Sequence, residues 1–194
     1  MIPHYGDKYE AEALFSPSDA VEAQGDGLPD VPPAVVLGYQ SELTEAVRER
    51  SDSRVEVVRG QGVDLLSDAV GYVAVHESGI GAPVTATVAE NVIAAGAEAV
   101  AMLGGCAALQ PDLALDAAVL PTDAIRDEGV VSLCMESAAL WAVADYRGAD
   151  AATVHEIGDY LAPDEWAPDT AADRGLPEML APTVEALERH VVGR

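Results

Sequence analysis

Short apolar runs alternate with amphipathic stretches along most of the chain, and this alternation predicts strands followed by helices. Residues 34–38 (Ala-Val-Val-Leu-Gly) are typical of a buried strand that ends at a glycine. Further strands are expected at 54–58, 63–66, 71–75, 98–103, 117–120 and 151–157, and helices at 41–50, 84–95, 132–146 and 177–190. Residues 1–33 are rich in Pro, Gly and acidic residues, so we expect an irregular N-terminal arm there.

Strands that alternate with helices indicate one α/β domain over residues 1–194. We expect a three-layer α/β/α sandwich with a mixed, largely parallel central sheet. Sheets of this kind bind ligands at the carboxyl ends of their strands. Glycine-bearing turns follow predicted strands at Gly38, Gly79–Gly81 and Gly104–Gly105, so they should meet at one sheet edge and leave room for a ligand.

The charge of the chain limits its partners. Thirty-four Asp and Glu oppose ten Lys and Arg, and the net charge of −24 makes binding to DNA, RNA or anionic lipid unfavourable. The longest apolar runs are too short to span a bilayer, and residues 1–7 lack the basic and apolar regions of a signal peptide. We therefore expect a cytoplasmic protein with no nucleic-acid or membrane partner.

The two cysteines, Cys106 and Cys134, lie in apolar surroundings. Their number and spacing match neither a disulfide framework nor a CxxC metal site, so buried free thiols are expected. The four histidines, His4, His76, His155 and His190, are scattered and show no metal-ligand spacing.

Local sequence alone leaves the candidate functional residues ambiguous. Residues 79–83 (Gly-Ile-Gly-Ala-Pro) are too short for a dinucleotide fingerprint; they form either a tight turn or a set of N–H groups that hold an anion ahead of a helix. Glu136 begins a predicted helix, where a carboxylate also favours the helix dipole. Asp159 follows a predicted strand, where it is equally typical of a turn.

Five motifs in order resemble the nucleoside phosphorylases of the uridine and purine type. They are residues 79–83, residues 104–112 (Gly-Gly-Cys-Ala-Ala-Leu-Gln-Pro-Asp), residues 124–129 (Ala-Ile-Arg-Asp-Glu-Gly), residues 134–140 (Cys-Met-Glu-Ser-Ala-Ala-Leu) and residues 157–159 (Ile-Gly-Asp). The second and fourth are the most specific. Residues 36–40 (Val-Leu-Gly-Tyr-Gln) also look like an archaeal and bacterial subgroup of uridine phosphorylase-like proteins.

The resemblance implies reversible phosphorolysis, in which a nucleoside and phosphate give ribose 1-phosphate and a free base. No cofactor is expected, because inorganic phosphate is the co-substrate. Glu136 falls on the glutamate that binds the ribose hydroxyls, and Met135 on the methionine beneath the sugar. Asp159 falls on the general acid to a purine base, and Gly38 and Gly105 fall on phosphate-loop positions.

Two further positions imply a homo-oligomer. Arg59 falls on the arginine that the family lends to a neighbouring subunit's phosphate, and His4 on the histidine that reaches a neighbour's ribose 5′-hydroxyl. A dimer is then the minimal active unit, and the family often builds hexamers from such dimers.

The chain also departs from the family pattern. Met102 stands where an arginine is common, Gly105 where a Ser or Thr is common, and Cys134 where an acidic residue is usual. The arginine of the early loop is absent from residues 38–42, so Arg59 is the one plausible phosphate cation. A family segment of a few dozen residues is missing near 129–132: either the chain lacks it, or the sequence does not represent it.

These departures leave three hypotheses. The leading one is a nucleoside phosphorylase, for which Glu136→Ala should abolish activity with little loss of stability. The second is a nucleosidase that uses water, and the third is an idle nucleoside- or nucleotide-binding protein. Base preference stays open, because Asp159 favours purines and residues 36–40 favour uridine.

The acidic composition predicts a salt-dependent, halophilic protein. At molar salt the Debye length is about 3 Å, which screens the self-repulsion of a −24 chain. We expect the urea midpoint of unfolding to rise steadily from low to molar KCl. An unfolding midpoint that does not change with KCl would contradict this hypothesis.

Overall fold

The fold of the chain is built around a mixed β-sheet. The computed structural model describes residues 14–23, 30–51, 53–57, 61–110, 112–115, 117–121, 132–162, 165–168 and 175–193. Within these residues the sheet has nine strands: β2 pairs with β3, followed by β4, β1, β5, β8 and β6, while β7 pairs with β5 and β9 with β8. The strands are β1 (Ala34–Gly38), β2 (Arg54–Glu56), β3 (Gly62–Leu65), β4 (Val70–Ala74), β5 (Ala99–Ala108), β6 (Ala118–Val119), β7 (Ser132–Leu133), β8 (Asp150–Ala162) and β9 (Glu165–Pro168).

The parallel part of the sheet is its centre. β1 pairs in parallel with β4 and β5, and β5 pairs in parallel with β8, whereas the outer pairings are antiparallel. All five residues of β1 are buried, as expected for a strand covered on both faces. The predicted mixed α/β/α architecture is therefore confirmed, with its parallel strands confined to the middle of the sheet.

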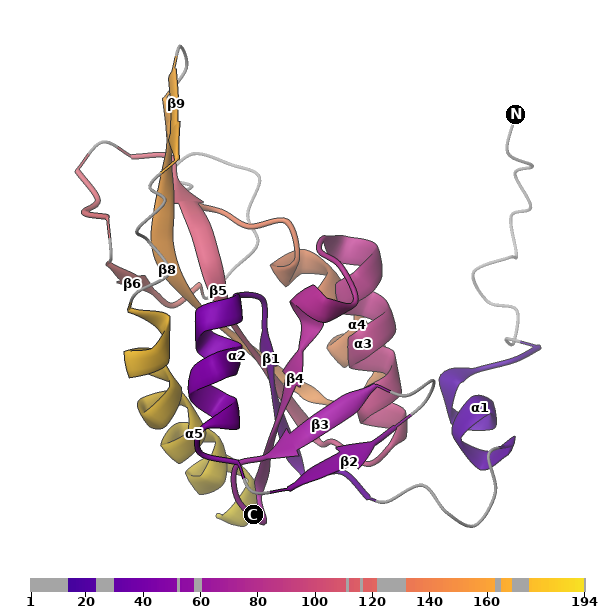
Figure 1. Cartoon of the computed structure of the whole chain (residues 1–194). Helices are drawn as coiled ribbons and strands as arrows, with labels where there is room; N and C mark the ends of the chain where they lie inside the picture. Colours follow the sequence, from indigo (N-terminus) through magenta and orange to yellow (C-terminus); the bar gives the residue numbers. More distant parts are fainter. Residues whose placement is uncertain are drawn as a thin grey trace, which may run out of the picture.

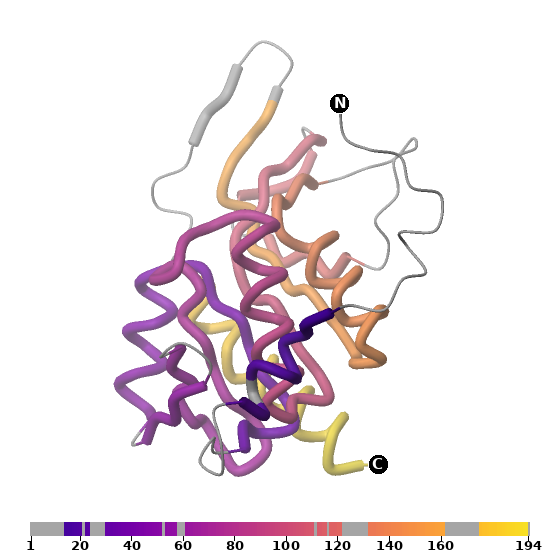
Figure 2. The backbone as a smooth tube through the Cα atoms, turned by 90° about the vertical axis from the view of Figure 1, so that its right-hand side faces the viewer, coloured from indigo at the N-terminus to yellow at the C-terminus, as the bar shows by residue number. Residues whose placement is uncertain are grey.

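Helices cover both faces of the sheet (Figure 1). Helices α2 (Ser41–Arg48) and α5 (Leu176–Val192) contact each other on one face, and α3 (Ala82–Ala94) and α4 (Ser137–Arg147) contact each other on the opposite face. In Figure 2, α3 and α4 lie toward the viewer and α5 lies behind the sheet. Each pair of helices buries its own apolar cluster against the strands. No helix in the described part of the chain is long and apolar enough to cross a bilayer.

Several predicted boundaries are wrong, and strand pairing explains two of them. β5 does not end before Gly104–Gly105: both glycines continue the strand, because they pair with His155 and Glu156 of β8. β8 likewise runs past residue 157, so Asp159 lies inside a strand instead of after one. A register shift between Cys106 and Ala107 accommodates the extra β8 residue.

Two other predictions missed a short element. The N-terminal arm is not wholly irregular, since it contains α1 (Pro17–Ala23), which packs against α3. The helix predicted from residue 132 begins at Ser137, and Ser132–Leu133 form β7 instead. Of residues 129–132, where the sequence indicates a missing segment, only Ser132 lies among the described residues.

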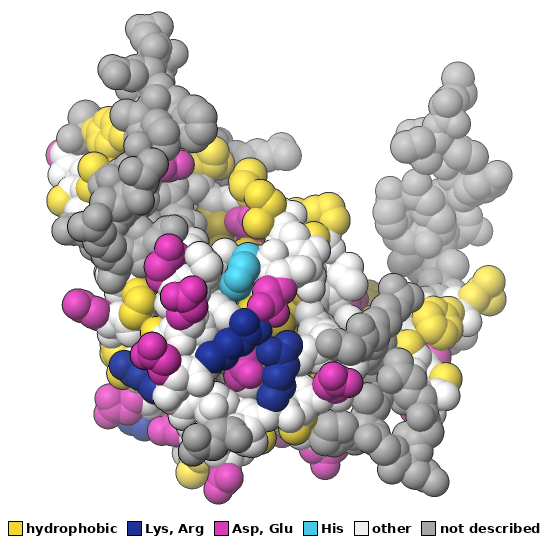
Figure 3. Space-filling view, in the orientation of Figure 1, with side chains coloured by type: hydrophobic (Ala, Val, Ile, Leu, Met, Phe, Trp, Pro, Cys, Tyr) yellow, Lys and Arg dark blue, Asp and Glu magenta, His cyan; other side chains and the backbone are white. Residues whose placement is uncertain are grey.

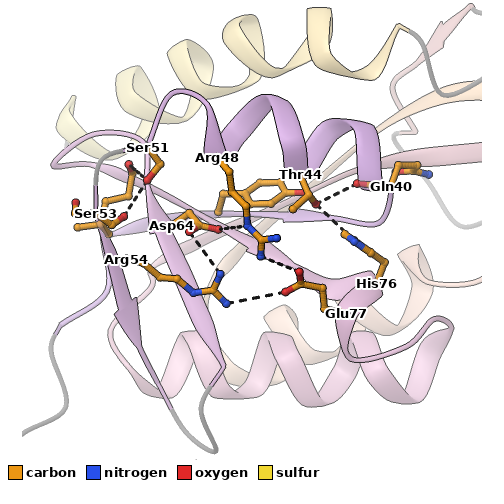
Figure 4. Close-up of polar contacts among 11 residues, drawn as sticks. Gln40, Thr44, Arg48, Ser51, Ser53, Arg54, Asp64, His76 and Glu77 are labelled. Atoms are coloured by element: carbon orange, nitrogen blue, oxygen red, sulfur yellow. Dashed lines mark hydrogen bonds and ion pairs between the residues drawn. The ribbon is translucent and has the colours of Figure 1, made fainter.

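A cluster of ion pairs joins α2 to the β2–β3 hairpin and to the 3₁₀ turn Val75–Glu77 (Figure 4). Asp64, only 5% exposed, lies between Arg48 (3.8 Å) and Arg54 (3.7 Å), and Arg48 also contacts Glu77 at 2.8 Å. The Arg54 guanidinium lies over Gly62, where no side chain obstructs it. Figure 3 shows basic side chains side by side near the centre of one face and others at its left edge, with carboxylates spread over the same face.

Gly38, at the end of β1, is required by the packing of Tyr72. The Tyr72 hydroxyl shares a 2.7 Å hydrogen bond with Thr44, and burial raises the pKa of Tyr72 to about 12, so the phenol stays neutral. A Cβ added at Gly38 would lie 2.0 Å from the Tyr72 hydroxyl oxygen. Because Gly38 has no side chain, the Tyr72 ring can pack against the end of β1.

We expect Gly38→Ala to lower the free energy of unfolding by about 1–3 kcal/mol, because the ring must move within a packed core. Gly105→Ala is the matched control: its Cβ would meet only the Gln40 amide nitrogen at 3.3 Å and a backbone oxygen at 4.0 Å. Urea unfolding in molar KCl measures both. Equal stability of the two variants would contradict this account of Gly38.

Candidate functional site

A pocket of about 440 Å³ opens where the end of β1, β5 and the start of α4 come together. This volume is in the range of small-molecule sites. It is lined by Tyr39, Gln40, Ile80, Met102, Gly105, Cys106, Ala107, Leu133, Cys134, Met135, Glu136, Asp159 and Leu161. The lining brings together the residues after β1, Ile80 from the loop before α3 and Gly105 of β5. The three glycine segments therefore meet at one pocket as predicted, but Gly104–Gly105 do so from within a strand and not from a turn.

Glu136 is the central polar group of the pocket. Its residue is only 6% exposed, and Oε1 accepts a hydrogen bond from the backbone N–H of Gly81 at 2.9 Å. Gly81 precedes α3 with φ = 91°, a conformation that favours glycine, and Glu136 itself precedes α4. The carboxylate thus lies at the N-termini of two helices, whose dipoles favour a negative charge.

Cys134 supplies the second contact of that carboxylate. Its thiol lies 3.3 Å from Glu136 Oε2, in position to donate, while the backbone N–H of Glu136 points to the Cys134 sulfur at 3.4 Å. Burial raises the pKa of the Cys134 thiol and raises that of Cys106 to about 11. Both thiols are therefore protonated at neutral pH, and Cys134 keeps the proton that it shares with the carboxylate.

Tyr39 forms the wall of the pocket next to Glu136. Its hydroxyl shares a 2.7 Å hydrogen bond with Thr85 of α3. Burial raises the pKa of Tyr39, and the nearby Glu136 charge adds to the shift, so the phenol remains neutral. Tyr39 therefore contributes an aromatic face and a neutral hydroxyl, and it adds no second anion beside Glu136.

Gln40 lies across the glycine pair of β5. Its amide nitrogen would be 3.3 Å from a Cβ at Gly105, and its amide oxygen 3.7 Å from a Cβ at Gly104. Gln40 also precedes the first turn of α2, where backbone N–H groups have no intrahelical partner. The Gln40 amide and the first N–H groups of α2 thus lie at the end of β1, and the amide borders Gly105.

A second layer of polar contacts supports the start of α4. His155 of β8 is fully buried, and its Nε2 lies 3.0 Å from the Ser137 hydroxyl. Burial lowers the pKa of His155, with a smaller opposing effect from the Gly105 backbone, so the ring is neutral. The Ser137 hydroxyl also points to the Met102 sulfur at 3.8 Å, which links β8, α4 and β5 behind the pocket.

The predicted site residues have different outcomes. Glu136, Met135, Asp159 and Gly105 all line the pocket. Gly38 does not, because it is buried in the sheet against Tyr72. Met135 is 63% exposed, and Asp159 is half-buried on β8 opposite Ala107.

His4 and Arg59 lie outside the described residues. No Lys, Arg or His lines the pocket within the described part of the chain. The described residues also contain no group of three or more His, Cys, Asp or Glu that could hold a metal.

Sequence reasoning missed Tyr39, Gln40 and the thiol contact of Cys134 as parts of this site. Gln40 had one usable signal, its place in a loop where the family pattern has an arginine. Tyr39 and Cys134 had no usable periodic signal, because their contacts depend on how distant strands and loops pack.

Comparisons with known proteins agree with this geometry. The model of the phosphorylase superfamily matches residues 32–134. The chain is similar in structure to uridine phosphorylase from Vibrio fischeri, with TM-score 0.61, 17% identity, and 81% of this chain and 90% of that chain covered. It is similar to purine nucleoside phosphorylase from Toxoplasma gondii in complex with immucillin-H, with TM-score 0.62, 15% identity and coverage of 81% and 91%.

A third similar structure is AMP nucleosidase from Bacteroides thetaiotaomicron, with TM-score 0.60, 18% identity and coverage of 85% and 91%. No curated protein sequence matches the chain significantly. At these identities the structural likeness establishes the fold, which phosphorylases and nucleosidases share.

The burial of Glu136 changes how it should be tested. Glu136→Ala leaves the Gly81 N–H without its acceptor, so we expect the free energy of unfolding to fall by about 1–3 kcal/mol. Glu136→Gln retains Oε1 as an acceptor and should cost less than half as much. Urea unfolding of both variants measures the difference. Equal losses in the two variants would show that the Gly81 hydrogen bond adds no stability.

Proposed function

The chain belongs to the phosphorylase superfamily, and on that premise we propose that its pocket cleaves the N-glycosidic bond of a nucleoside with inorganic phosphate. The products are ribose 1-phosphate and a free base. One observation carries the proposal: Gly105, the adjacent pair Met135 and Glu136, and Asp159, which come from three separate motifs, line a single pocket.

In this proposal Glu136 holds the sugar. One carboxylate oxygen is fixed by the Gly81 N–H, so the group keeps one orientation while it accepts hydrogen bonds from the ribose hydroxyls. Met135 contributes an exposed apolar side chain beside it. The carboxylate also stabilises the positive charge that develops on the sugar in an oxocarbenium-like transition state.

Asp159 and the glycine pair take the two remaining roles. Asp159, on β8, hydrogen-bonds the departing base and gives it a proton. Phosphate approaches beside Gly105, where the absent side chain leaves room and the N–H groups of the first turn of α2 favour an anion. The Gln40 amide, which lies over Gly105, adds a neutral donor there.

Hydrolysis is the second candidate, and one observation favours it. None of the described residues that line the pocket carries a positive charge, while two of them are carboxylates. Water needs no cation for its binding, and a nucleosidase would release free ribose. AMP nucleosidase from Bacteroides thetaiotaomicron, which has a similar fold, is one such case by name.

We further propose that the active unit is a homo-oligomer, either a dimer or a hexamer built from dimers. His4 and Arg59 carry this proposal, because the family pattern assigns both to a neighbouring subunit's site. Arg59 would then supply the positive charge that the described pocket walls lack.

The decisive assay measures release of base from uridine, inosine and adenosine in molar KCl, with and without phosphate. We expect release to require phosphate and Glu136→Gln to lower kcat/KM by about 100-fold or more, because the sugar-binding carboxylate loses its charge. Glu90→Gln is the control: Glu90 is a half-buried glutamate, paired with Arg147 at 2.6 Å and absent from the pocket lining.

The other outcomes decide between the alternatives. Base release with free ribose and without phosphate would replace phosphorolysis by hydrolysis. Thermal stabilisation by a nucleoside without turnover would identify a binding protein. Equal loss of activity in Glu136→Gln and Glu90→Gln would remove Glu136 from the proposed mechanism.

A further inference from the structure

The two cysteines of the chain lie at a short antiparallel pairing, Cys106 within β5 and Cys134 directly after β7. β5 and β7 pair through Ala107 with Leu133 and Ala108 with Ser132. One step further in the same register, Cys106 comes opposite Cys134. Directly opposed residues in antiparallel strands have Cα atoms about 4.5–5.5 Å apart, and disulfides span Cα separations of roughly 4.4–6.8 Å. This range suits a disulfide, provided that the Cys134 sulfur turns toward Cys106 from its present contacts with Met102 and Glu136.

Their side chains also point to the same face of the sheet. The Cys134 sulfur lies 4.0 Å from the sulfur of Met102. Met102 and Cys106 are four residues apart on β5, so their side chains project to one face. Cys134 also packs against Cys106 in a small apolar cluster with Ile157. Independent contacts thus agree with the register.

The two thiols differ in access. Cys134 is half-buried, Cys106 is 7% exposed, and both line the pocket of the candidate site. We propose that Cys106 and Cys134 form a reversible disulfide in the wall of this pocket, with a small-molecule disulfide such as oxidised glutathione as the oxidant. Cys134 is the thiol that reacts first, because the reagent reaches it from the pocket.

The reaction balances as two thiol–disulfide exchanges. Cys134 loses its proton and attacks one sulfur of glutathione disulfide, forming a mixed disulfide and releasing one reduced glutathione. Cys106 then loses its proton and attacks the Cys134 sulfur, which releases the second reduced glutathione. The protein pair is oxidised by two electrons, and the two protons end on the two glutathione thiols.

The disulfide changes the surroundings of Glu136. The bond removes the Cys134 thiol proton, so the 3.3 Å contact with Glu136 Oε2 loses its donor. It also ties β5 directly to the segment that carries Met135 and Glu136. We therefore expect the oxidised protein to differ from the reduced protein in KM for the nucleoside, a consequence that rests on the proposed function.

The chemical test does not depend on activity. The folded protein is treated with oxidised glutathione, quenched with acid, and then unfolded in urea at mildly alkaline pH with excess iodoacetamide, which alkylates the thiolate form, before intact-mass analysis. We expect a monomer that has lost two hydrogen atoms and takes up no alkyl group, and that regains two alkylation sites after reduction.

The matched control moves the second thiol by one residue. Leu133→Cys in a Cys134→Ser background places a thiol on the adjacent residue, which is 50% exposed and projects to the opposite face of β7. This variant should give a glutathione adduct without an internal disulfide. Wild-type protein that keeps two alkylatable thiols while the control is modified would overturn the proposal, as would disulfide-linked dimers or an equal yield of internal disulfide in the control.

Measuring nucleoside cleavage by the oxidised and reduced protein distinguishes the disulfide proposal from the proposed function. If oxidation forms the internal disulfide and reduction restores the original KM, both proposals gain support. If the disulfide forms in a protein that cleaves no nucleoside, the proposed function fails and the disulfide stands. If a catalytically active protein forms no internal disulfide, the disulfide proposal alone fails.

Discussion

The hydrogen bond from the Gly81 N–H to the Glu136 carboxylate joins two parts of the molecule that are 55 residues apart in sequence. It fixes the loop before α3 to the residue before α4, and these two helices pack against each other on one face of the sheet. The carboxylate has no described cation beside it, so helix dipoles and a thiol stabilise it instead. The shape of the pocket depends on this contact, because Ile80 on one side and Met135 on the other are neighbours of the bonded residues.

Glycine has a separate physical reason at each of three places around this contact. Gly81 adopts φ = 91°, which a residue with a side chain rarely tolerates. Gly38 leaves space for the Tyr72 ring, and Gly105 leaves space between β5 and the Gln40 amide. Gly81 is required by backbone conformation, Gly38 by core packing, and Gly105 by the space that the pocket needs beside β5. The three glycines of this chain therefore serve three different structural purposes.

Much of this arrangement follows from the sequence, and the remainder depends on pairing between distant segments. The apolar run at 34–38 and the helices at 41–50 and 177–190 could be predicted from local periodicity, and Glu136, Met135 and Asp159 from motif order. Gly104–Gly105 resemble a turn locally, yet pairing with β8 keeps them in a strand. β7 has only two residues, so its pairing with β5, and with it the opposition of Cys106 and Cys134, gives no periodic signal.

The acidic residues of the chain repel phosphate, the acceptor in the proposed reaction, both within the pocket and over longer distances. Two like charges about 6 Å apart repel by about 3 kcal/mol at an effective dielectric constant of about 20, so Glu136 and Asp159 both oppose an anion in the pocket. The rest of the −24 charge acts over longer distances, and molar salt, with a Debye length of about 3 Å, screens it. What salt cannot remove is the local repulsion inside a partly buried pocket. Phosphate binding must therefore come from short-range donors, namely helix N–H groups, the Gln40 amide and a cation from outside the described walls. The same local field does not oppose a neutral water molecule, so within the proposed function the supply of that cation would decide between phosphorolysis and hydrolysis.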